Sequence, residues 1–149
     1  RWLPDACPCG LPFRRLSPLR GRLDEQVSCA WGNVHPEFFE PLLAGVRGLG
    51  ADWQVAIYER DLKPVFQFRL EIEGDALTRE DAVQVVVGEL GHRYPAAWMA
   101  YCQRLVDIEF CFFPPGTFRR DRKLLRLVDE RASGPPAWVQ DAIQARPPQ

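Results

Sequence analysis

Two strand-like segments separated by a short turn constrain the fold of this chain more than any other feature. In residues 53–58 and again in 65–72, apolar side chains occupy every second position. A period of two is typical of strands that bury one face. Residues 61–64, Asp-Leu-Lys-Pro, carry the polar and proline signals of a turn. The pattern predicts a hairpin whose apolar face lies on a hydrophobic core.

The elements around this hairpin determine the expected fold class. Apolar residues at helical spacing predict helices at 36–46, 80–92 and 96–106. Short apolar runs predict strands at 26–29, 107–113 and 124–128. The order β-α-β-β-α-β over 26–113 predicts an α+β fold of the ferredoxin-like kind. We therefore expect a small antiparallel sheet with two helices on one face, preceded by an extended leader.

The expected core consists of the apolar positions that this pattern turns to one side. It comprises Trp53, Val55, Ile57, Phe66, Phe68, Val83, Val87, Leu90, Ile108 and Phe110. The spacing in 96–106 also predicts an inward-facing set, Trp98, Met99, Cys102 and Leu105.

The chain has the length of one domain with flanking segments, at 149 residues. Residues 1–25 are rich in proline, glycine and arginine, and we expect them to form a leader and hinge that end a larger N-terminal domain. Residues 26–131 are the expected domain, and 132–149 a tail with a short helix. The first residue is Arg1 rather than methionine, which indicates a processed chain or a piece of a longer one.

Charge and hydropathy argue against two classes of partner. Nineteen basic and 20 acidic residues give a net charge of −1, whereas nucleic-acid-binding domains usually carry a basic excess. The basic cluster at 119–126 is therefore not expected to bind nucleic acid. No apolar run approaches the roughly 20 residues that span a bilayer, so we expect no membrane partner.

The cysteines indicate a reducing, cytoplasmic setting. Their odd number, five, and their scattered positions do not resemble a disulfide framework. Cys7 and Cys9 form one close pair, but a structural zinc site needs four ligands. We expect a metal site there only if residues outside this chain complete it.

Short motifs in a fixed order connect the chain to a known family. They are Cys-Pro-Cys-Gly at 7–10, Gly-Arg-Leu-Asp-Glu at 21–25, Asn-Val-His-Pro at 33–36, Pro-Pro-Gly-Thr at 114–117, Lys123, and Arg-Leu-Val-Asp-Glu-Arg at 126–131. In order and spacing, they resemble the phenylacetate–CoA ligase-like family of acyl-adenylate-forming enzymes. The resemblance runs over residues 7–131.

The resemblance implies a mobile C-terminal lid domain. Family members use ATP to convert a carboxylic acid into an acyl-adenylate and then pass the acyl group to coenzyme A. ATP, Mg²⁺ and the acid would be bound through an N-terminal adenylation domain outside this chain. The isolated chain is therefore expected to be inactive, and its sequence does not specify the acid.

The motif match also implies roles for individual residues. Arg22 would contact the nucleotide, Asp24 and Glu25 would form the hinge, and Lys123 would be the catalytic lysine of adenylation. Lys123 is one of only two lysines in a chain with 19 basic residues. Arginine cannot always replace the compact ammonium of lysine. A lysine kept in such an arginine-rich chain therefore agrees with a specific role.

Two departures from the family pattern leave alternatives open. Residues 30–32 are Ala-Trp-Gly, where the family has Arg-Gly-Val on the surface used for thioester formation. The use of coenzyme A as the acceptor therefore stays open. Residues 120–123 are Arg-Asp-Arg-Lys, where the family has Ser-x-Gly-Lys. The alternative function is that of a stand-alone ferredoxin-like binding or regulatory module that has lost catalysis.

Overall fold

A computed structural model describes residues 2–3, 15–16, 25–73, 79–119 and 124–144. The elements in chain order are β1 (Trp2–Leu3), β2 (Arg15–Leu16), β3 (Val27–Cys29), β4 (Gly32–Val34), α1 (Pro36–Leu43), β5 (Leu49–Arg60), β6 (Lys63–Ile72), α2 (Arg79–Arg93), α3 (Pro95–Cys102), β7 (Asp107–Phe113), β8 (Leu127–Asp129) and α4 (Ala137–Gln144). The α+β class is confirmed.

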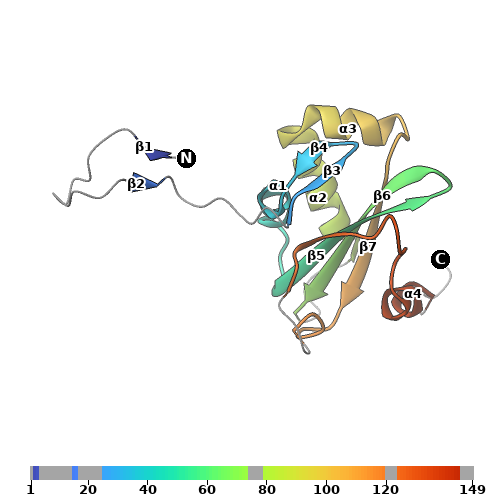
Figure 1. Cartoon of the computed structure of the whole chain (residues 1–149). Coiled ribbons are helices and arrows are strands. Elements are labelled where there is room, and N and C mark those ends of the chain that lie inside the picture. The colour runs from blue at the N-terminus through green and yellow to red at the C-terminus, as the bar shows by residue number, and fades with distance from the viewer. Residues whose placement is uncertain (1, 4–14, 17–24, 74–78, 120–123, 145–149) are drawn as a thin grey trace.

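The central sheet has the strand order β7-β6-β5-β8 (Figure 1). The predicted hairpin is confirmed as the antiparallel pair β5–β6, with Val55 opposite Phe68. The outer strands β7 and β8 each run parallel to their neighbour, so the prediction of an antiparallel ferredoxin-like sheet was wrong. β7 runs parallel to β6 because of the connection between them. α2 and α3 cross over one face of the sheet and return the chain to the end at which β6 began.

The strand expected at 26–29 does not join this sheet. It forms β3, which pairs with β4 in a separate two-stranded hairpin, with Val27 opposite Val34. Gly32 has a φ of 88°, which permits this tight turn. The place beside β5 is taken by β8 instead. A separate pair, β1–β2, lies in the leader.

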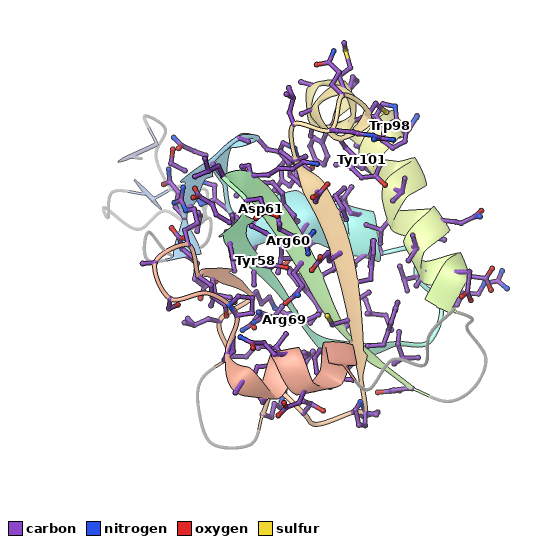
Figure 2. All side chains as sticks on the ribbon, turned by 90° about the vertical axis from the view of Figure 1, so that its right-hand side faces the viewer. Tyr58, Arg60, Asp61, Arg69, Trp98 and Tyr101 are labelled. Carbon is purple, nitrogen blue, oxygen red and sulfur yellow. The ribbon has the colours of Figure 1, made fainter. Side chains whose placement is uncertain are left out.

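One face of the sheet carries the main hydrophobic core, beneath α1 and α2. Phe39 and Leu42 of α1 and Val86 and Leu90 of α2 pack with buried side chains of β5 and β6. α4 lies against the opposite face, where Val139 packs with Cys111 and Phe113 of β7. Figure 2 shows α4 in front of the sheet and α1 behind it.

Most of the predicted core is confirmed. Of the ten residues, six are buried: Trp53, Val55, Ile57, Phe66, Phe68 and Leu90. Ile108 and Phe110 are partly buried against this core. Val83 and Val87 are only half-buried, because α2 is rotated so that Ala82 and Val86 face inward.

The predicted inner face of the 96–106 helix was wrong for Met99, Cys102 and Leu105, whereas Trp98 packs against the core as predicted. α3 ends at Cys102, and Arg104 has a φ of 57°, which ends helical geometry. Met99 and Leu105 are 56% and 60% exposed. α3 packs against α2 through Trp98. The Trp98 ring lies so close to Gly91 of α2 that a Cβ added at Gly91 would be 3.4 Å from it.

None of the helices in the described part of the chain is long and apolar enough to cross a membrane.

Candidate functional site

The face of the sheet opposite α1 and α2 is polar yet buried. Gln67, Arg69 and Glu71 of β6 are at most 2% exposed, and Asp52 of β5 is 3% exposed. Buried polar groups are tolerated when each has a hydrogen-bond partner. We call this set of side chains on β5, β6 and β7 the polar face. Figure 2 shows Arg69 at its α4 end and Tyr58 and Arg60 further along it.

The connection between β7 and β8 is held to the polar face at Glu71. This connection is residues 114–126, and we call it the lysine segment because Lys123 belongs to it. Glu71 Oε2 accepts a hydrogen bond from the Gly116 amide at 2.9 Å, and Oε1 accepts one from the Phe118 amide at 2.9 Å. Gly116 has a φ of 80°, so a side chain at this turn would be strained. One buried carboxylate therefore fixes two backbone amides of the same turn.

A second attachment joins Arg119 to Asp52. The guanidinium donates from Nη2 to Asp52 Oδ1 at 3.0 Å and from Nε to Oδ2. The Arg119 side chain is 70% exposed, whereas that of Asp52 is 4% exposed. The hydrogen bonds to Asp52 are the main cause of a raised pKa of Arg119. The buried carboxylate thus anchors an otherwise solvent-facing arginine.

The far end of the lysine segment returns to the same half of β5. Gln54 Nε2 donates to the Leu125 carbonyl at 2.9 Å, and the Val55 amide donates to the Arg126 carbonyl at 2.8 Å. The Arg126 guanidinium lies 4.7 Å from the centre of the Trp53 ring, in cation–π contact. Its Nη1 is buried and has no hydrogen-bond partner among the described residues.

Arg69 connects several side chains at this end of the polar face through hydrogen bonds. It is fully buried and donates to both carboxylate oxygens of Glu130, at 2.9 and 2.6 Å. It also donates to Gln54 Oε1 at 2.7 Å and to Gln67 Oε1 at 2.8 Å. The Trp138 ring of α4 lies 5.6 Å from the guanidinium. These bonds satisfy a buried cation that would otherwise be costly.

The other end of the polar face, near the β5–β6 turn, forms a separate network. Glu109 accepts hydrogen bonds from Tyr58 at 2.6 Å and from Arg60, while Lys63 pairs with Asp107. Burial, and then the hydrogen bond to Glu109, raises the pKa of Tyr58. The hydrogen bond from Lys63 lowers the pKa of Asp107.

An open groove of about 480 Å³ lies beside this network. It is lined by Lys63, Tyr101, Cys102, Arg104 and Asp107. Of the motif residues that the structure describes, none lines this groove.

Comparison with known proteins gives a relative whose sequence matches most of the chain. Phenylacetate-coenzyme A ligase of Thermus thermophilus is 25% identical over 137 residues, which cover 85% of this chain and 31% of the relative. No family model matches the chain. The chain resembles the C-terminal domain of phenylacetate–CoA ligase. It spans about a third of the length of that relative.

One solved structure shares the fold of this chain. A 2-hydroxyisobutyryl-CoA ligase in the postadenylation state, in complex with R3-HIB-AMP, has a TM-score of 0.53 and 23% identity, covering 87% of this chain and 27% of that one. A domain of phenylacetate-coenzyme A ligase from Bacteroides vulgatus has a TM-score of 0.48 and 16% identity, covering 74% of this chain and 96% of that domain.

Most of the candidate site residues that the sequence indicated lie outside the described part of the chain. These are Cys7, Cys9, Arg22, Asp24 and Lys123. Glu25 is described; it is half-buried and lies two residues before β3. Among the residues that the structure covers, no group of three or more His, Cys, Asp or Glu could hold a metal ion.

Sequence reasoning missed the residues that attach the lysine segment. Asp52, Gln54 and Glu71 were polar positions in or beside predicted strands, and such positions usually face solvent. A signal was present in the tail: Trp138 and Val139 provide the apolar side of a helix, and such a helix can cover a second sheet face.

Proposed function

We propose that this chain is the mobile C-terminal domain of an enzyme that activates a carboxylic acid with ATP and transfers the acyl group to coenzyme A. The observation that carries the proposal is the match to phenylacetate-coenzyme A ligase over 85% of the chain. The proposed partner is an N-terminal adenylation domain that holds ATP, Mg²⁺ and the acid. In this proposal, residues 1–25 are the leader and hinge, 26–131 the lid and 132–149 the tail.

Lys123 is the proposed catalytic residue of the first half-reaction. Adenylation brings the acid carboxylate and the α-phosphate together, so negative charge accumulates at one point. A cation positioned there stabilises the transition state more than the ground state. The lysine ammonium is compact and lies on a flexible stem, which suits a residue that approaches from a separate domain.

The surroundings of Lys123 fit an anionic nucleotide. Its neighbours in sequence include Arg119, Arg120, Arg122 and Arg126, which form a strongly basic stretch. Arg22 is the second proposed nucleotide contact.

Asp24 and Glu25 are the proposed hinge. They follow a glycine at position 21 and precede β3, so they connect the leader to the domain. A few residues that change φ and ψ are enough to rotate a domain between two states. The rotation would bring the lysine segment to the adenylation domain for the first half-reaction and remove it for the second.

Coenzyme A is the proposed acceptor in the second half-reaction. Residues 30–32 lack the arginine of the family pattern, and here Trp31 stacks on Phe66 with ring centres 3.7 Å apart. This turn therefore presents a tryptophan packed into the core instead of an exposed cation. The binding of coenzyme A would rely on other cations of the domain or its partner.

The test is ATP-dependent pyrophosphate release by the native polypeptide that carries this chain with its adenylation domain. A panel of carboxylic acids identifies the substrate. With that acid, Lys123→Ala should reduce release by roughly two orders of magnitude or more. Lys63→Ala, the other lysine of the chain, is the matched control and should leave release nearly unchanged. Equal release by all three proteins would overturn the catalytic assignment of Lys123. No release by the wild-type polypeptide with any acid would favour the regulatory module over the ligase.

A further inference from the structure

We propose that Asp52, Gln54 and Glu71 are positioning residues that hold the lysine segment in the geometry needed for adenylation. The inference rests on the proposed function of Lys123 and adds residues that the sequence motifs did not indicate. All three lie at the α4 end of the polar face. Each binds a different point of the segment. Glu71 accepts hydrogen bonds from the amides of Gly116 and Phe118. Asp52 binds the Arg119 side chain, and Gln54 binds the Leu125 carbonyl.

Glu71 has the strongest geometric evidence. Its carboxylate is 2% exposed, and both oxygens accept from backbone amides of the turn, each at 2.9 Å. Bonds to backbone amides fix the path of the chain, whatever side chains the turn carries. Gly50 leaves room for Glu71, because a Cβ added at Gly50 would lie 3.1 Å from the Glu71 Cβ. Its burial and its two hydrogen bonds leave the carboxylate little freedom to leave the turn.

Gln54 connects the buried arginine to the far end of the segment. Arg69 can only donate, so Gln54 must turn its carbonyl oxygen toward the guanidinium. This orientation directs the amide nitrogen to the Leu125 carbonyl, 2.9 Å away. Arg69 is itself held by both oxygens of Glu130. The position of Leu125 is thus determined by a connected network rather than by one exposed contact.

Asp52 completes the attachment on the other side of Lys123. Its carboxylate is buried and binds Arg119 through two nitrogens. Arg119 and Leu125 are therefore both attached to β5 within three residues, at Asp52 and Gln54. Only the five residues 120–124 lie between these attachments. We infer that attachment of the described residues on both sides of Lys123 lowers the entropic cost of placing its ammonium in the active site.

The experiment compares Glu71→Gln and Asp52→Asn with a matched control, Glu109→Gln. The control makes the same amide substitution on the same face, but Glu109 binds Tyr58, Arg60 and Gln67 at the opposite end. The first readout needs no activity: trypsin cleavage within 119–126 of the chain, followed by mass spectrometry. Glu71→Gln and Asp52→Asn should be cleaved there roughly tenfold faster than wild type and the control, because local opening becomes easier.

The second readout is adenylation by the polypeptide that includes the adenylation domain. Loss of positioning should lower kcat roughly tenfold with little change in the KM for the acid. Transfer from supplied acyl-adenylate should be unaffected. If either substitution lowers overall stability, Arg119→Gln provides a second test, because that side chain is 70% exposed. It should reproduce the effect of Asp52→Asn, and the double variant should add nothing further.

The outcomes separate this inference from the proposed function. If Lys123→Ala leaves adenylation unchanged, the proposed function fails, and the positioning role fails with it. If Lys123→Ala stops adenylation but Glu71→Gln and Asp52→Asn alter neither cleavage nor kcat, the positioning role alone is overturned. A change in cleavage without a change in kcat, or the reverse, also overturns the positioning role. The role requires that a substitution that loosens the segment also slows adenylation.

Discussion

The two faces of β6 are equally buried but depend on different kinds of interaction. Phe66, Phe68 and Leu70 are inaccessible to solvent on one face, and Gln67 and Arg69 are inaccessible on the other. The apolar side chains gain from any close neighbour of suitable volume. The polar ones need named partners at hydrogen-bond distance. We infer that the apolar face provides most of the global stability, whereas the polar face specifies where particular segments lie.

The largest stability change is expected on the apolar face. Phe68→Ala removes a ring that stacks on Phe110 at 5.2 Å and contacts Phe39 edge-on at 5.8 Å. The resulting cavity should lower the free energy of unfolding by roughly 3–5 kcal/mol in a urea titration. Phe68→Leu, which keeps much of the volume, should cost clearly less. A loss below about 1 kcal/mol for Phe68→Ala would contradict the assignment of this face as the core.

On the polar face, a change that conserves charge should still be costly. Arg69→Lys keeps the cation but loses the planar fork that reaches Glu130, Gln54 and Gln67 at once. We expect a loss of roughly 2–3 kcal/mol in the free energy of unfolding. The control is Arg93→Lys in the exposed pair with Glu89, which should change stability by less than about 0.5 kcal/mol. Equal effects for both substitutions would show that the polar face does not depend on defined partners.

The Tyr58–Glu109 contact extends the comparison to alkaline pH. The pKa of Tyr58 is raised by burial and by its bond to Glu109, so the folded protein keeps a proton that the unfolded chain releases above pH about 10. Stability from this group is present below that pH and is lost as the pH rises. Between pH about 9 and 11, the wild-type free energy of unfolding should fall by roughly 1 kcal/mol more than that of Tyr58→Phe. Parallel pH profiles would exclude the contribution.

The smallest change is expected at the β5–β6 turn, which belongs to neither face. Leu62 has a φ of 63° and is 95% exposed, so it is strained without burying its side chain. Leu62→Gly should therefore raise the free energy of unfolding by a few tenths of a kcal/mol to about 1 kcal/mol, measured by thermal unfolding. A destabilised variant would indicate that Leu62 has a packing role that the structure does not show.

The sequence predicted the apolar face better than the polar one, for a physical reason. A period of two identifies the buried side of β5 and β6, because one apolar environment selects alternate residues within a single strand. The burial of Arg69 depends on α4 and on Glu130, which lie about 60 to 75 residues further along the chain. The local pattern around Arg69 contains no signal of those partners.

Strand partners were also beyond local reasoning. The pattern at 26–29 indicated a strand correctly, but it gave no means to choose between β4 and the central sheet. The direction of β7 depends on the crossover through α2 and α3, not on its own residues. Lys123, Arg22 and Asp24 were reached through motifs alone. Because they lie outside the described residues, their roles stay predictions.

The most direct test of the account is to measure the two half-reactions separately in the Lys123→Ala protein, using the polypeptide that includes the adenylation domain. Formation of acyl-adenylate should be slower by roughly two orders of magnitude or more, because the cation that stabilises its transition state is gone. Transfer from supplied acyl-adenylate to coenzyme A should proceed at nearly the wild-type rate, because the domain rotation removes this segment for that step. Unchanged adenylation, or an equal loss in both half-reactions, would contradict the assignment of Lys123.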